Sequence, residues 1–348
     1  DVPEEGGDLS QQSVPGGGLQ ITSGDGVYPV MVYRPGWEVR EEPFDFGQVL
    51  PGIRYPVHHS EDLAVDRYAN WAGQNPDANS LHRLREALGF NRRSAHDPNL
   101  PYGRLHGSKL AKVPSGGRRV FRRLEKAKKR SYAVLIGVDL SGSTHSRAAG
   151  DRDVNDVLVE LAYRQAELLA AVGVPFMVVG HTGRHRYDGD YLLKELSSAE
   201  RRLWPSSTTT DLYLAKTFAE PWQREQKLAM LSFPACAQNL DGQTMQTYIR
   251  LLAAQRATDR LLLYYTDGAM PAEDSVRQQA ILESELSRAS DWSKRKDHRL
   301  SVIGVGYNTD SPKQYGLDTI EVNGSDGIKS NIQTVVSGLA ERIARTIK

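Results

Sequence analysis

The sequence has a single cysteine, Cys236, among its 348 residues. One cysteine excludes an internal disulfide and any zinc or iron–sulfur site that needs several thiolates. Long apolar runs are missing as well. The longest mostly apolar stretch, residues 168–180, contains a proline and is too short to span a bilayer of about 30 Å. Since no signal-peptide pattern is visible either, we expect a cytoplasmic protein without a membrane segment.

An excess of charge of either sign is also missing, because 44 basic residues face 43 acidic ones. This balance indicates neither a nucleic-acid partner nor a membrane surface. The phosphate-binding P-loop motif is absent. Residues 106–110, HGSKL, contain glycine, serine and lysine, but not in the required order or spacing. Any ATP hydrolysis of the P-loop kind would have to be supplied by another protein.

The motifs of nucleophilic hydrolases are equally absent. Ser141 lies in DLSGS rather than in a Gly-x-Ser-x-Gly turn, and no histidine is placed by sequence as its base. His181 and His185, with Asp188, could bind a transition metal, but histidines on a loop more often bond to backbone or face solvent. His145 follows DLSGS closely enough to support neighbouring metal ligands. We expect no intrinsic enzymatic activity.

Three regions follow one another along the chain. Residues 1–30 are rich in Gly, Ser and Pro without periodicity, which indicates a flexible arm. Residues 31–130 predict an irregular N-terminal region with two helices, near residues 60–73 and 79–89. From residue 131 to 348, apolar strands alternate with amphipathic helices. This alternation predicts a doubly wound, mostly parallel α/β sheet with helices on both faces.

The second region ends in a basic stretch, residues 116–130, with eight Lys or Arg and one Glu. A solvated helix face or a domain connector is the preferred interpretation, because no stacking aromatics or base-reading motif accompany the charges. A nucleic-acid patch is the less favoured alternative. A contact surface for an acidic protein partner lies between the two.

Carboxyl and hydroxyl side chains gather where the first strand of the α/β region ends. The apolar run YAVLIGV leads into VDLSGST, which places Asp139, Ser141 and Ser143 in Asp-x-Ser-x-Ser spacing. A later strand ends in YYTDG and puts Asp267 in a matching position. Ligands of doubly wound sheets bind at the carboxyl ends of strands, and hard oxygen ligands suit Mg²⁺, with Mn²⁺ and Ca²⁺ as alternatives. The competing interpretation is that the two aspartates only cap the segments that follow them.

DLSGS after an apolar strand, with TDG after a later one, resembles the metal-ion-dependent adhesion site (MIDAS) of the von Willebrand factor A (VWA) fold. The resemblance implies metal ligands in these two motifs and a further ligand from an intervening loop. Asp241, in NLDGQT, is preferred, because it precedes the TDG strand by about 20 residues, the distance that one helix needs. Thr210 and Thr244 are the alternatives.

The order NLDG, helix, apolar strand, TDG is similar to that in the C-terminal domain of the cobaltochelatase subunit CobT, and VLIGVDLSGST also resembles NorD. The resemblance covers about residues 80–348. It implies a non-catalytic, Mg²⁺-dependent protein-binding subunit that couples a MoxR- or CobS-type AAA+ ATPase to a target, such as a chelatase of cobalamin biosynthesis. A third protein would supply an acidic ligand to the metal.

A second class of function would use the same site for metal-dependent self-assembly or adhesion. The single cysteine and the lack of a visible export signal favour the adaptor instead. So does the stretch RLREALGF…YGRLHGSKLAKV (residues 83–113), which is similar to the segment that precedes the metal-site domain in the CobT family. A homo-oligomer is compatible with both classes.

Overall fold

The computed structural model describes sixteen stretches of the chain, and all structural statements concern these. They are residues 30–33, 41–44, 61–89, 95–100, 102, 104–105, 107, 113–114, 119–125, 130–148, 152–185, 208–235, 238–268, 275–293, 299–314 and 316–345. Residues 1–29 of the predicted flexible arm, and Asp188, lie outside this set.

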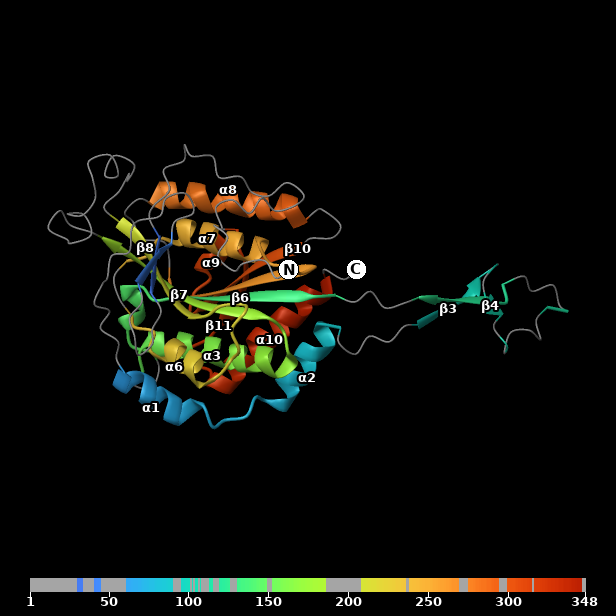
Figure 1. Ribbon diagram of the computed structural model, residues 1–348, viewed down its shortest axis with the longest axis horizontal. Helices are drawn as coiled ribbons and strands as arrows, with labels where there is room; N and C mark the ends of the chain where they lie inside the picture. Colours follow the sequence, from blue (N-terminus) through green and yellow to red (C-terminus); the bar gives the residue numbers. More distant parts are fainter. Residues whose placement is uncertain are drawn as a thin grey trace, which may run out of the picture.

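An eight-stranded sheet forms the centre of the molecule, in the order β11-β10-β9-β6-β7-β8-β1-β2 (Figure 1). Its strands are β1 (Val30–Tyr33), β2 (Glu41–Phe44), β6 (Tyr132–Asp139), β7 (Phe176–His185), β8 (Thr208–Lys216), β9 (Asp259–Thr266), β10 (Arg299–Tyr307) and β11 (Asp318–Val322). From β11 to β7 neighbouring strands run parallel. β8 is antiparallel to β7, and β1 is parallel to β8 but antiparallel to β2.

The two central strands, β6 and β9, are buried along their whole length. Continuous burial is expected of parallel strands that are covered on both faces, and it explains their unbroken apolar sequences. The predicted mostly parallel α/β sheet is therefore confirmed. β1 and β2 come from the predicted irregular region and extend the sheet beyond β8.

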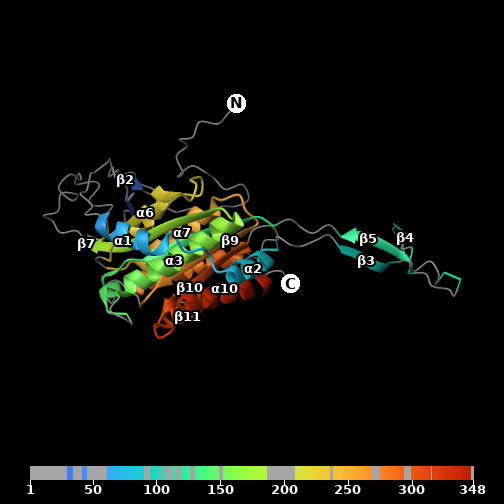
Figure 2. The ribbon, with the colours of Figure 1, turned by 90° about the horizontal axis from the view of Figure 1, so that it is seen from below.

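Helices cover both faces of the sheet (Figures 1 and 2). One face carries α7 (Asp241–Ala253) and α8 (Ser275–Ser293). The other carries α3 (Val154–Val172), α6 (Arg224–Leu231) and α10 (Ile328–Arg345), with α1 (Glu61–Trp71) and α2 (Ala78–Ala87) packed outside them. Two short helices, η2 (Gly142–His145) and α9 (Ser311–Gln314), lie in loops after β6 and β10. Each face has its own apolar core.

Glycine in β6 lets a helix side chain lie directly against the sheet. A Cβ atom built on Gly137 would come within 2.5 Å of the Tyr248 ring of α7. At the end of α3, Gly173 has φ +79° and closes the helix in the left-handed conformation that glycine adopts without strain. These glycines set how closely α7 packs and where α3 stops.

The N-terminal helix α1 is fixed to the domain through Arg67, which is buried. Its guanidinium donates hydrogen bonds to Asp156 (2.5 and 3.0 Å) and to Asn155 (2.8 Å) of α3. It also donates to the carbonyls of Leu231 (2.8 Å) and Phe233 (3.2 Å) at the end of α6. One side chain therefore joins α1, α3 and α6.

A second, three-stranded sheet stands apart from the body in both views (Figures 1 and 2). Its strands are β3 (Ala95–Leu100), β4 (Arg104–Leu105) and β5 (Phe121–Glu125), with β5 between the other two and antiparallel to both. β5 lies inside the basic stretch that the sequence predicted as a helix face or connector. Hydrogen-bonded neighbours on both sides outweigh the helix preference of its Arg, Leu and Glu residues.

None of the helices in the described ranges is long and apolar enough to cross a membrane.

Candidate metal centre

The centre forms around Asp139, the last residue of β6, whose side chain is fully buried. Its Oδ1 accepts a hydrogen bond from the backbone N–H of Ser141 (2.9 Å). Its Oδ2 accepts from Thr266 Oγ1 at the end of β9 (2.8 Å) and from Asn239 Nδ2 before α7 (3.2 Å). β6 and β9 are parallel neighbours, so their ends reach the same edge of the sheet. Asp139 thus fixes three separate loops at that edge.

Two serines and a second aspartate form a row of oxygen atoms beside Asp139. Ser141 Oγ lies 3.0 Å from Ser143 Oγ, and Ser143 Oγ donates to Asp267 Oδ1 at 3.0 Å. The turn η2 keeps both serines on one side, because Thr144 Oγ1 donates to the carbonyl of Ser141 (2.6 Å). Ser141 is buried, Asp267 is half-buried and Ser143 is exposed. The row therefore leads from the interior to solvent.

Asp241, the first residue of α7, belongs to the same cluster. Asn239 Nδ2 donates to Asp241 Oδ2 (3.0 Å) as well as to Asp139 Oδ2, so one amide joins the two carboxylates. The alternatives lie near the same loop: Thr210 of β8 pairs with Gly183 of β7, which lies beside Asn239 and Leu240, and Thr244 lies one turn further along α7. Neither threonine hydroxyl has a hydrogen-bond partner among the described residues. Both threonines are fully buried. The placement of Asp241 agrees with its predicted role as a ligand, which stays a prediction.

His181 lies behind the cluster rather than at the surface. It is fully buried in β7, with Nε2 2.9 Å from Tyr264 OH and Nδ1 3.0 Å from Tyr248 OH. Tyr264 OH donates to Asp241 Oδ1. Because that hydroxyl has one proton, its oxygen accepts from His181 Nε2–H. The imidazole therefore orients Tyr264 toward Asp241 and is not placed to bind an exposed metal.

Two carboxyl groups of the cluster, those of Asp139 and Asp267, lie in surroundings that raise their pKa. Burial raises the pKa of Asp139 to about 6; the carboxylates of Asp241 and Asp267 also raise it, whereas His181 lowers it. Burial likewise raises the pKa of Asp267, against the hydrogen bond from Ser143. Among the described side chains, no Lys or Arg forms an ion pair with these aspartates. The cluster therefore lacks positive charge.

The row of oxygen atoms fits a small divalent cation. Adjacent ligand oxygens of an octahedral Mg²⁺ complex, with bonds of 2.0–2.1 Å, lie about 3.0 Å apart. Ser141 Oγ, Ser143 Oγ and Asp267 Oδ1 follow one another at 3.0 Å. All the donors are oxygen, as Mg²⁺ and Mn²⁺ prefer. Two of these three donors are serine hydroxyls. Among the described residues, Asp, Glu, His and Cys side chains alone form no metal-binding group of three, so the site depends on the two serines.

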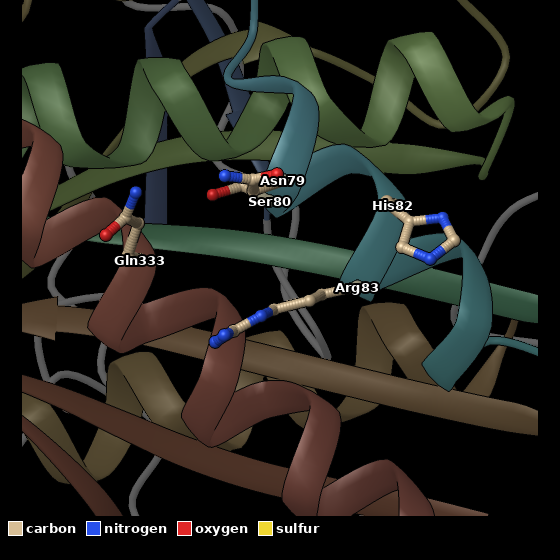
Figure 3. A pocket seen from close by; sticks show the side chains of 5 residues that line it. All are labelled: Asn79, Ser80, His82, Arg83 and Gln333. Carbon is tan, nitrogen blue, oxygen red and sulfur yellow. The ribbon is translucent and has the colours of Figure 1, made fainter.

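Other predicted or visible features lie outside the centre. The side chain of His145 is exposed on η2, and that of His185 lies outside what the structure describes. A hollow of about 340 Å³ lies between α2 and α10, lined by Asn79, Ser80, His82, Arg83 and Gln333 (Figure 3). Arg83 reaches across it and donates to Ser337 Oγ (2.6 Å). This hollow carries a helix-to-helix contact and no carboxylate.

Asn239 and Tyr264 are the members of the cluster that the sequence did not predict. Asn239 lies in NLDG, two residues before Asp241. Its place in the same loop as a predicted ligand is the sequence feature that could have identified it. Tyr264 lies on the same face of β9 as Thr266, two residues further along the strand. This position identifies Tyr264 as a neighbour of the cluster only when the strands beside β9 are known.

Residues 120–343 match the family model of the cobalamin biosynthesis protein CobT VWA domain. No curated protein matches the chain.

Several solved structures are similar to the chain at low sequence identity. The minor pilin PilB from Streptococcus sanguinis is 13% identical, with a TM-score of 0.40 over 65% of each chain. A von Willebrand factor type A protein from Catenulispora acidiphila is 13% identical, with a TM-score of 0.32 over 65% of this chain and 44% of that one. The vWF domain of the pili tip protein Mfa5 from Porphyromonas gingivalis is 9% identical, with a TM-score of 0.35 over 64% and 98%. The chain spans 65% of the PilB chain and 44% of the Catenulispora acidiphila chain. It spans nearly all of the Mfa5 domain, at 98%.

Proposed function

The chain belongs to the CobT VWA-domain family, and from this premise we propose that it is a non-catalytic, Mg²⁺-dependent protein-binding subunit. The observation that carries the proposal is the row of oxygen atoms from Ser141 through Ser143 to Asp267, which begins at the buried Ser141 and reaches solvent at Ser143. A site that opens to solvent on one side can bind metal and partner together.

The side chains of the centre would have distinct roles. Ser141, Ser143 and Asp267 would hold the metal directly. Asp139 and Asp241, which do not form a three-carboxylate group with Asp267 in this structure, would become further ligands when their side chains turn toward the metal. When bound, Mg²⁺ supplies an open coordination position that a carboxylate of another protein can fill. Asn239 would keep the carboxylates of Asp139 and Asp241 in place.

The work of such a subunit would come from another protein. The sequence has no P-loop, so we propose a MoxR- or CobS-type AAA+ ATPase as the partner that hydrolyses ATP. The target would be a complex into which a metal is inserted, such as a cobaltochelatase of cobalamin biosynthesis. Family membership supports this target class.

A pull-down from native lysate tests the proposal. The bait is wild type, Asp139→Ala or Ser143→Ala, each with Mg²⁺ and with EDTA, and Ser290→Ala on the exposed side of α8 is the matched control. We expect an AAA+ ATPase or a chelatase subunit to be retained by wild type and control with Mg²⁺ only. Retention that is unchanged by EDTA and by both site variants would contradict a metal-dependent role.

A further inference from the structure

Three buried side chains behind the metal centre have no part in the function proposed above. They are Tyr248 of α7, His181 of β7 and Tyr264 of β9, and we call them the aromatic chain. None of the three residues is more than 3% exposed. The imidazole is stacked on the Tyr264 ring, with centroids 5.1 Å apart and planes at 25°, and it meets the Tyr248 ring edge-on at 5.6 Å and 83°. The three rings therefore hold one another in place.

The aromatic chain reaches across β6 because that strand has a glycine at the crossing. His181 lies on β7 and Tyr264 on β9, the two neighbours of β6, and Tyr264 pairs with Gly137. A Cβ atom on Gly137 would come within 2.5 Å of the Tyr248 ring. Since no side chain stands there, rings from both neighbouring strands and from α7 can meet over β6.

Donor and acceptor counts set the direction of the hydrogen bonds in the aromatic chain. Tyr264 OH donates its one proton to Asp241 Oδ1, so its oxygen accepts from His181 Nε2–H at 2.9 Å. A neutral imidazole with its proton on Nε2 has a lone pair on Nδ1, which faces Tyr248 OH at 3.0 Å. The carbonyl of Val179 lies further from that hydroxyl, at 3.4 Å. The protons of the aromatic chain thus point toward Asp241.

The carboxylate of Asp241 is held from both sides. Its Oδ1 accepts from Tyr264 OH, and its Oδ2 accepts from Asn239 Nδ2 at 3.0 Å. Hydrogen bonds to a charged oxygen are stronger than those between neutral groups. In this position Asp241 forms no three-carboxylate metal group with Asp139 and Asp267. Asp241 must therefore give up one of its two bonds before it can turn toward the row of oxygen atoms.

We propose that Tyr264, held in place by His181, retains Asp241 away from the metal and thereby sets the Mg²⁺ affinity of the centre. The proposal rests on the metal site of the proposed function. In the retained state, the row of oxygen atoms alone holds the metal. In the released state, Asp241 has left Tyr264 and adds a carboxylate ligand, so Mg²⁺ is bound more tightly. The retained state is favoured, because release leaves a buried hydroxyl without its acceptor.

The opposite role for the aromatic chain would be to present Asp241 to the metal. Two observations favour retention. Both carboxylate oxygens of Asp241 already accept hydrogen bonds from buried donors. The spacing of 3.0 Å that suits Mg²⁺ joins Ser141, Ser143 and Asp267 without Asp241. The two roles predict opposite changes in affinity when the Tyr264 hydroxyl is removed.

Calorimetric titration of Mg²⁺ into the metal-free full chain tests the proposal. Tyr264→Phe removes the hydroxyl but keeps the ring that stacks on His181. His181→Phe is a second route to release, because it removes the donor that fixes the Tyr264 hydroxyl. Circular dichroism verifies that each variant is folded.

Tyr265→Phe is the matched control. Tyr265 is the next residue of β9 and is fully buried, but it belongs to the apolar core of the opposite face of the sheet. Its hydroxyl has no hydrogen-bond partner among the described residues. The control therefore removes a buried tyrosine hydroxyl from the same strand without touching Asp241.

We expect Mg²⁺ to bind Tyr264→Phe at least roughly fivefold more tightly than wild type, and the control within roughly twofold of wild type. His181→Phe should gain at least roughly twofold. Adding Asp241→Asn to Tyr264→Phe should remove the gain, because the released side chain then has no charge. Damage to the fold would weaken binding, so a gain is not its result.

Urea unfolding in EDTA adds a readout without metal. Tyr264→Phe should unfold at lower urea than the control, because the bond that retains Asp241 is missing, and saturating Mg²⁺ should narrow this difference. Equal midpoints in EDTA overturn the proposal. So does Mg²⁺ binding by both Tyr264→Phe and His181→Phe that is no tighter than that of wild type, which leaves the metal site itself intact. Absence of binding by every protein overturns the metal site and this proposal together.

Discussion

Replacing Asp139 by Asn separates a metal ligand from a purely structural carboxylate. Asp139 is fully buried, and burial raises its pKa from 3.8 to about 6. An acid whose pKa is higher in the folded state binds protons more tightly there, so the metal-free protein loses stability as pH rises from about 4 to about 6. At neutral pH the buried charge costs about 3 kcal/mol, at 1.36 kcal/mol for each pKa unit.

Asn removes this cost but also alters hydrogen bonds. Its amide nitrogen would face Thr266 Oγ1 or Asn239 Nδ2, both of which donate to Asp139 Oδ2. Lost bonds of this kind cost about 1 kcal/mol each. At pH 7 the metal-free variant should therefore be more stable than metal-free wild type, by roughly 1 kcal/mol. Because Asn does not titrate, this advantage should shrink by about 1 kcal/mol between pH 7 and pH 5.

Urea unfolding followed by circular dichroism measures both proteins in EDTA and in Mg²⁺ over this pH range. Mg²⁺ should stabilise wild type, because only the folded state binds it, and should leave the variant nearly unchanged. A variant that is less stable than wild type by more than about 2 kcal/mol at every pH in EDTA would refute the reasoning. In that case the carboxylate serves to cap its loops.

Three further predictions concern the body of the fold. Gly137→Ala should lower stability by roughly 1–3 kcal/mol, because its methyl group displaces the Tyr248 ring; thermal unfolding measures this. Arg67→Met should cost about 3 kcal/mol and speed proteolysis within α1, since it leaves Asp156 and two carbonyls without their donor. Burial lowers the pKa of Lys216 to about 8 from 10.5. Between these two pH values the unfolded chain binds more protons than the folded one, so wild-type stability should rise with pH, by roughly 1–2 kcal/mol from pH 8 to pH 9.5. Urea unfolding measures this rise, and Lys216→Met should abolish it.

The parts of the fold that were predictable are those in which local sequence and tertiary packing agree. β6 and β9 are continuous apolar runs because they are covered on both faces. α3 ends at Gly173, where a left-handed residue is needed. The ends of two parallel neighbours meet at one edge, so Asp139 and Asp267 could be expected to lie together.

The remainder depends on contacts between distant parts of the chain. β8 is antiparallel to β7 and next to β1, nearly 180 residues before it, which no local pattern records. β5 is a strand because β3 and β4 pair with it, although its sequence favours a helix. Asn239 and Tyr264 matter because of where Asp139 and Asp241 lie in space. Spacing along the chain predicts candidate ligands, but not the residues that orient them.

Calorimetric titration of Mg²⁺ into metal-free wild type, Ser143→Ala and the control Ser290→Ala tests the metal centre most directly. Ser143 is exposed, so its loss should leave the fold intact while removing the oxygen between Ser141 and Asp267. We predict a single Mg²⁺ site in wild type and control, and at least roughly tenfold weaker binding in Ser143→Ala. Equal binding by all three proteins, or no binding by wild type, would contradict the assignment.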